Sequence, residues 1–214
     1  MSPVNPYSIV LDTDDVILDF KNGFRIQAEL TLQKKLVELN TNYSMSERYG
    51  ITKKEEALVW KALDDGGWGK LPLIEGADTA IKELQEMGMK IHIVTCIDPK
   101  NENYRMENFE RYDIRPDTID CAGAGTFSKT PFIQKYMPIS VVDDRLQHVN
   151  ENLFVPHRVW IDLKDDQVGM PTDNVTFRAN SLAHYVTECR AQLAAEILNH
   201  SVQIQRNVSK LKVA

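Results

Sequence analysis

The chain has 214 residues, of which 43% are hydrophobic and 26% are charged, and its formal net charge is -6. This balance is typical of a globular protein and excludes a disordered or fibrous chain, and the negative charge argues against a nucleic-acid polymer as partner. No apolar run approaches the ~18–20 residues that a membrane-spanning helix needs. With no secretory signal and only three widely spaced cysteines, a cytoplasmic location without disulfides or a zinc site is expected.

The first predicted element is a short buried strand at residues 8–11, which leads directly into four polar residues, 12–15, three of them aspartates. Residues 20–69 carry helical patterns instead. Thr52 and Glu55 have the spacing of a capping box, and Gly66 and Gly67 follow the helix that it starts. We therefore expect a helical cap, residues 20–69, inserted after the first strand.

Strands and helices alternate beyond the cap. Further strands are expected at residues 91–95, 118–122, 139–142 and 158–163. This alternation predicts an α/β fold with a three-layer, Rossmann-like parallel sheet covered by helices on both faces. The core domain is expected to comprise residues 1–19 and 70–180.

A helical extension is expected at residues 181–214, after the core domain. Apolar side chains from Leu182 to Ile197 fall on one face of the predicted helix. Packing of this face against the core is the simplest interpretation, and a homodimer contact through the helix is the alternative.

Polar residues lie at or just beyond the ends of four predicted elements. They are Asp12 and Asp14 after the first strand, Thr95 and Cys96 at the second, Lys129 before a short helix, and Asp143 and Asp144 after the fourth strand. Ligands of open parallel sheets bind beyond the carboxyl ends of the strands, so these residues are expected to meet in one crevice.

The residue types suit phosphoryl transfer. The carboxylate of Asp12 can attack phosphorus and form an aspartyl-phosphate, while Asp14 can serve as general acid and base. Mg²⁺ prefers oxygen ligands, which Asp12 and one of Asp143 or Asp144 can supply. The expected cofactor is therefore magnesium, and the expected partner is a small phosphorylated substrate.

Three further residues suit contacts with the phosphate. Lys129 offers a positive charge and Thr95 a hydroxyl donor, and Cys96 follows directly on Thr95. Lys135 competes with Lys129 for the lysine role, although it lies on a predicted helix, where a surface lysine is common. Cys96 on its own is more often a small buried residue than a nucleophile.

With these motifs, the chain resembles the haloacid dehalogenase-like (HAD) superfamily, in its phosphatase branch. Residues 10–16 are similar to its first motif, residues 93–95 to its second, Lys129 to its third and residues 140–144 to its fourth. The resemblance covers roughly residues 8–165. It implies a strand order of 5-4-1-2-3 and a mobile cap that helps to choose the substrate.

The resemblance also implies how magnesium is held. Asp14 would contribute its backbone carbonyl, and Asp144 would be the more direct ligand with Asp143 beside it. The match to nucleotidases that act on nucleoside monophosphates is loose. Asp15 departs from the family pattern, which often has glycine there, so its carboxylate either disfavours an anionic substrate or points outward.

Several alternatives stay open from the sequence. The acidic residues after the first strand can be a solvated turn that caps a helix. A phosphomutase would use the same residues, whereas a dehalogenase would not need Asp14. A phospho-switch receiver is disfavoured by the order of the motifs. A catalytically inactive relative that serves as a binding protein is kept open by Asp15 and Asp98.

Overall fold

The computed structural model describes residues 4–125, 128–164 and 170–211, so the outer ends of two predicted domains, residues 1–3 and 212–214, lie outside the described residues. All strand pairs are parallel, in the order β3-β2-β1-β4-β5-β6. The strands are β1 (Asn5–Leu11), β2 (Lys90–Thr95), β3 (Thr118–Cys121), β4 (Pro138–Asp143), β5 (His157–Ile161) and β6 (Phe177–Ala179). The α/β class is confirmed and the five predicted strands keep their expected order. The short edge strand β6 extends the sheet beyond the prediction.

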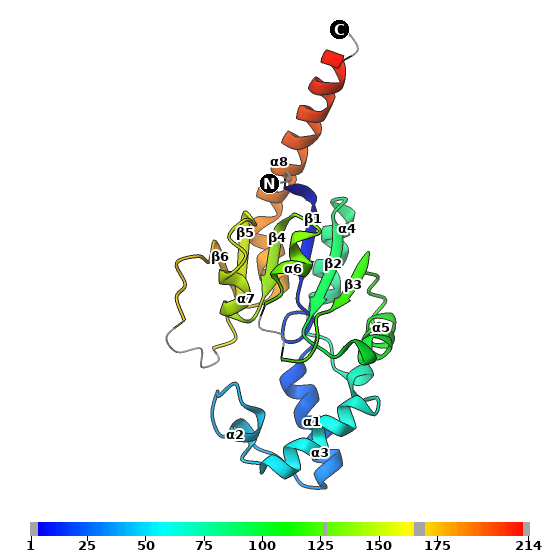
Figure 1. Ribbon diagram of the computed structural model, residues 1–214, viewed down its shortest axis with the longest axis vertical. Helices are drawn as coiled ribbons and strands as arrows, with labels where there is room; N and C mark the ends of the chain where they lie inside the picture. Colours follow the sequence, from blue (N-terminus) through cyan, green and yellow to red (C-terminus); the bar gives the residue numbers. More distant parts are fainter. Residues whose placement is uncertain (1–3, 126–127, 165–169, 212–214) are drawn as a thin grey trace.

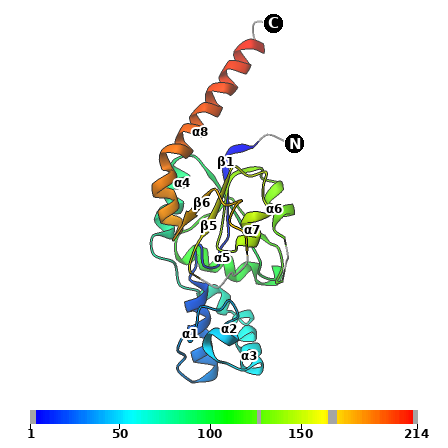
Figure 2. The same cartoon turned by 90° about the vertical axis from the view of Figure 1, so that its left-hand side faces the viewer.

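Helices cover both faces of this sheet (Figures 1 and 2). The described residues form the helices α1 (Phe20–Leu32), α2 (Met45–Tyr49), α3 (Lys53–Asp64), α4 (Ala77–Glu86), α5 (Glu102–Arg111), α6 (Thr130–Gln134), α7 (Leu146–Asn150) and α8 (Leu182–Leu211), with short 3-10 helices η1 (Gly67–Lys70) and η2 (Pro99–Asn101). Of these, α1, α2 and α3 lie in the cap and not on the sheet (Figure 1). Ile9 and Leu11 belong to a core that includes residues of α4 and α8, whereas Val10 packs with Ile133 of α6. Both faces of β1 are therefore buried at Ile9, Val10 and Leu11. A strand buried on both faces has an apolar run in its sequence, which is why β1 could be predicted.

The helical cap lies beyond the carboxyl ends of the strands (Figure 1). Its predicted capping box is present, since the Thr52 side chain accepts a hydrogen bond from the Glu55 backbone N–H at 3.2 Å and the Glu55 carboxylate accepts one from the Thr52 N–H at 2.8 Å. The two connections to the core run side by side, because the Asp19 N–H donates to the Pro72 carbonyl at 2.8 Å. The division of the chain into domains remains a prediction.

The C-terminal helix α8 packs its first half against the sheet. Leu182, Tyr185 and Leu193 are buried in the core, and the Tyr185 hydroxyl donates to Ser140 Oγ at 2.9 Å. Its second half extends away from the body of the molecule (Figure 2). A homodimer contact through this helix remains a prediction. Among the described residues, no helix combines the length and apolar character that crossing a bilayer requires.

Candidate active site

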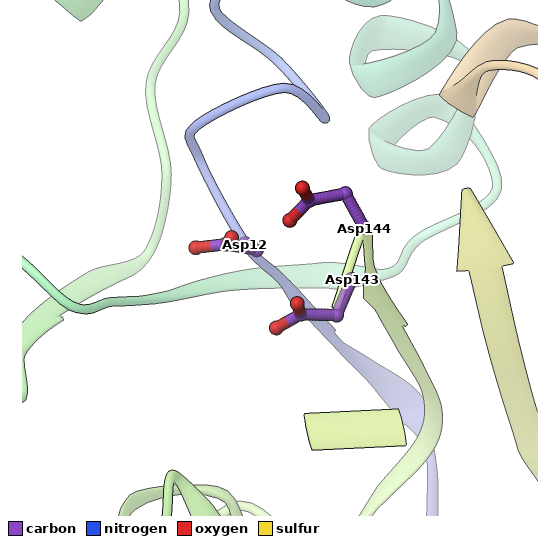
Figure 3. Close-up of side chains that lie close together, drawn as sticks. All are labelled: Asp12, Asp143 and Asp144. Carbon is purple, nitrogen blue, oxygen red and sulfur yellow. The ribbon is translucent and has the colours of Figure 1, made fainter. Parts of the chain in front are cut away.

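Three aspartates converge at the carboxyl ends of β1 and β4 (Figure 3). Asp12 follows β1, and its backbone N–H donates to the Val142 carbonyl at 2.9 Å, which holds the two strand ends side by side. Asp143 is the last residue of β4 and Asp144 comes next. Each offers one carboxylate oxygen, and these three oxygens lie within 4.8 Å of one another. All three residues are buried, so their charges require compensation.

Lys129 supplies part of that compensation. Its side chain is 2% exposed, and its Nζ lies 2.8 Å from Asp12 Oδ1 and 2.7 Å from Asp143 Oδ2. Although burial opposes its charge, these two carboxylates raise the pKa of Lys129 above its ordinary value. Lys135, the competing lysine, pairs instead with Asp120 near the surface.

The cluster still carries more negative than positive charge. Burial, opposed by Lys129 and reinforced by Asp143 and Asp14, raises the pKa of Asp12 to about 7. Burial and the neighbouring Asp143 also raise the pKa of Asp144 well above its ordinary value. Three buried carboxylates that share one ammonium are a donor set suited to a hard divalent cation such as Mg²⁺. The residues present therefore fit the metal that the sequence suggested.

Asp14 sits at the edge of this cluster and forms an ion pair that the sequence did not predict. Arg105 Nη2 lies 2.8 and 3.0 Å from the two carboxylate oxygens of Asp14. Arg105 belongs to α5 and is completely buried. No sign of this ion pair is visible in the sequence, because the buried face of α5 is largely polar. Asn108 and Phe109 are buried there together with Arg105.

Asp15 is buried rather than directed outward, so the outward alternative was wrong. Its Oδ2 lies 2.7 Å from Lys21 Nζ. Burial raises the pKa of Asp15, and Lys21 partly offsets that rise. Its backbone φ of 60° is in the left-handed region, where glycine is the most favourable residue and aspartate is tolerated better than most.

Thr95 and Cys96 occupy different surroundings at the end of β2. Thr95 is fully buried, and within the described part of the chain its hydroxyl has no hydrogen-bond partner. Cys96 lines the cavity, with its Sγ 3.8 Å from His148 Nε2. Burial raises the pKa of the Cys96 thiol to about 12, so it stays protonated at neutral pH. A thiol in this state is a weak nucleophile.

A cavity of about 640 Å³ separates the helical cap from the aspartates. Asp12, Asp14, Asp144 and Lys129 line it from the core side. From the opposite side, Phe20, Trp60 and Trp68 line it and form an aromatic wall. The Phe20 ring lies 5.9 Å from that of Trp60 and 5.7 Å from that of Trp68, with nearly parallel planes. Trp60 and Trp68 thus face the cavity as well as each other.

A contact between the core and the cap borders the cavity. The Arg145 guanidinium lies 4.5 Å from the centre of the Tyr43 ring, and both residues line the cavity. Tyr43 belongs to the loop before α2, and Arg145 follows the acidic doublet. This pair places a cation beside Asp144, and sequence spacing gives no signal for it.

Known proteins share this fold but not this sequence. Neither protein-family models nor curated proteins match the chain. A dehalogenase crystal structure with an intermediate complex matches with a TM-score of 0.58 at 11% identity, over 87% of this chain and 98% of that one. The putative HAD-hydrolase YfnB from Bacillus subtilis, bound to magnesium, gives 0.58 at 15% identity over 86% and 98%. A putative phosphatase from Clostridium difficile gives 0.55 at 15% identity over 83% and 95%. The resemblance to HAD proteins is confirmed at the level of the fold.

Proposed function

We propose that this chain, which has the fold of HAD proteins, is a magnesium-dependent hydrolase of small phosphate monoesters. The observation that carries the proposal is the buried cluster of Asp12, Asp143 and Asp144 around Lys129. It opens on a cavity that Asp14 also lines. A HAD-hydrolase of the same fold binds magnesium, which supports the choice of metal.

In the proposed reaction, a carboxylate oxygen of Asp12 attacks the phosphorus of the substrate. The bond from phosphorus to the leaving oxygen breaks, and Asp14 gives its proton to that oxygen. Water then attacks the aspartyl-phosphate while Asp14 takes its proton. The bond between phosphorus and Asp12 breaks, which releases phosphate and restores the aspartate.

The other predicted residues would hold the metal ion, offset charge or bind the phosphate group. Mg²⁺, held by Asp12, Asp143 and Asp144 with the Asp14 carbonyl, would supply positive charge to the phosphoryl oxygens. Lys129 pairs with both Asp12 and Asp143 and offsets part of their charge. The Cys96 thiol lines the cavity, whereas the Thr95 hydroxyl is buried beside it and has no hydrogen-bond partner within the described part of the chain. Both are the proposed hydrogen-bond donors to the phosphate.

The first test is turnover of p-nitrophenyl phosphate. We expect phosphate release that requires Mg²⁺ and is lost in Asp12→Asn, while that variant keeps the unfolding temperature of the wild type. In Asp14→Asn, the phosphoenzyme should break down slowly, so a fluoride analogue of phosphate should still be trapped at Asp12. Undiminished activity of Asp12→Asn would remove Asp12 from its role.

The aromatic wall favours a narrower substrate class, the nucleoside monophosphates. A planar base can stack on aromatic faces, and such stacking contributes about 1–3 kcal/mol per base. Trp60 is 37% exposed and available for such a contact. We expect Trp60→Ala to raise KM for a nucleoside 5′-monophosphate but not for glycerol phosphate. The control is Leu58→Ala, an exposed residue of the same helix.

Three alternatives differ in what the protein would release. A phosphomutase would move the phosphoryl group to a second substrate hydroxyl, so wild-type protein would release little free phosphate. A dehalogenase would release halide, and it would not depend on Asp14. A catalytically inactive binding protein would bind phosphorylated ligands without turnover.

A further inference from the structure

Arg105 contacts the proposed general acid from a position that the cavity does not reach. Its side chain is 0% exposed, whereas the Asp14 side chain is 24% exposed and lines the cavity. Substrate in the cavity would therefore touch Asp14 and not Arg105. Any effect of Arg105 on the reaction would have to pass through the carboxylate of Asp14.

The surroundings of Arg105 hold its guanidinium in place. Its Cζ lies 5.4 Å from the centre of the Trp68 ring in η1. On the same helix, Asn108 Nδ2 donates to the Trp68 carbonyl at 2.9 Å. A Cβ added at Gly69 would lie 3.2 Å from the Tyr104 carbonyl oxygen, so η1 packs its backbone directly against α5. Arg105 is thus confined between Trp68 and Asp14.

Among the described residues, the hydrogen bonds of the Arg105 guanidinium all go to Asp14. Its Nη2 contacts both carboxylate oxygens, which opposes rotation of the carboxylate plane. Within the described part of the chain, its Nε and Nη1 are buried and have no hydrogen-bond partner. Arginine keeps its charge at every pH at which proteins fold, so this contact can persist throughout a reaction.

We propose that Arg105 is a positioning residue that holds the Asp14 carboxylate toward the leaving oxygen of the substrate. This inference rests on the proposed function, because it assumes that Asp14 transfers the proton. A carboxylate freed from Arg105 would rotate or move, and a displacement of about 1 Å in such a group can cost about 10²-fold in rate. Arg105 would thereby contribute to catalysis without touching the substrate.

The test compares two phosphate esters whose leaving groups differ in their need for a proton. A good leaving group such as p-nitrophenolate departs without a proton, whereas an alkoxide departs only with help from a general acid. We expect Arg105→Gln to lower kcat/KM for ethyl phosphate about 10²-fold and that for p-nitrophenyl phosphate less than about fivefold. Arg105→Lys, which retains a charge, should give an intermediate loss on ethyl phosphate. Arg111→Gln, an exposed arginine at the end of the same helix, is the matched control and should behave as wild type.

A double variant separates positioning from general damage to the fold. If Arg105 acts through Asp14, adding Arg105→Gln to Asp14→Asn should cause little further loss, because the two residues work as a unit. Equal losses on both esters, or full additivity with Asp14→Asn, would overturn the proposal.

A crystal structure of Arg105→Gln provides a measurement that does not require turnover. We expect the Asp14 carboxylate to leave its wild-type position while Asp12 and Asp144 stay in place. An unmoved Asp14 would overturn the positioning role. Failure of the wild-type chain to hydrolyse either ester would instead reject the proposed function, so the two failures are distinguishable.

Discussion

Replacing Lys129 by methionine tests whether this lysine is the counter-charge of the aspartate cluster. Methionine keeps a similar length but removes the ammonium that lies 2.8 Å from Asp12 and 2.7 Å from Asp143. Because both carboxylates are buried, the variant would hold them without compensation. Removing one partner of a buried ion pair costs about 3–5 kcal/mol.

That cost should be visible as a large change in thermal stability. For a chain of about this size, each kcal/mol changes the unfolding temperature by about 2–4 °C, so we expect the metal-free variant to unfold roughly 6–20 °C below the wild type. Bound Mg²⁺ would restore positive charge to the cluster. At 100 times its dissociation constant, Mg²⁺ would stabilise the folded state by about 2.7 kcal/mol.

The assay is thermal unfolding in EDTA and then in excess Mg²⁺. Lys135→Met is the control, because Lys135 is 47% exposed and its surface pair with Asp120 should contribute no more than about 1 kcal/mol. An unfolding temperature of Lys129→Met within roughly 2 °C of the wild type in EDTA would refute the reasoning. So would equal effects of the two substitutions.

Two other predictions concern residues near the site and in the sheet. Cys96→Ser should change kcat for p-nitrophenyl phosphate less than about fivefold, as measured by steady-state kinetics. Burial raises the pKa of the Cys96 thiol to about 12, so the thiol is not an anionic nucleophile that the substitution would remove. The ring of His92 stacks on that of Tyr136, and its Nδ1 is hydrogen-bonded to Thr118 Oγ1. Burial lowers the pKa of His92 below 6.5. Unfolded chains therefore bind more protons than folded ones just below pH 6.5, so stability falls as pH decreases. His92→Phe should lose less stability than wild type between pH 7.5 and 5.5 in urea unfolding.

The parts of the fold that the sequence predicted are those with strong local signals. The strands β1, β2 and β4 are largely buried on both faces and therefore appear as mostly apolar runs. The acidic residues that follow β1 and β4 were noticed because they end such runs. Parallel pairing then brings the strand ends together, which is why the positions of Asp12 and Asp143 followed from the sequence.

The elements and contacts that the sequence did not predict lack such signals. Strand β6 has three residues and only Ala179 is buried, so it has neither an apolar run nor a clear alternation. In α5, the inward face includes Arg105 and Asn108, and a search for apolar periodicity passes over it. Burial of these polar groups depends on partners from distant segments, Asp14 and the Trp68 carbonyl. No pattern within α5 encodes those partners.

Asp15 shows how a departure from a motif can be compatible with the proposed chemistry. Glycine would adopt the φ of 60° with less strain, but it would lack the carboxylate that accepts from the Lys21 backbone N–H at 3.2 Å and pairs with the Lys21 ammonium at 2.7 Å. These contacts fasten the turn after β1 to the first turn of α1, where the cap begins. Lys21 offsets only part of the charge of Asp15, which still helps to raise the pKa of Asp144. Because the extra acid adds negative charge beside the cluster, it is compatible with the divalent cation proposed for the site.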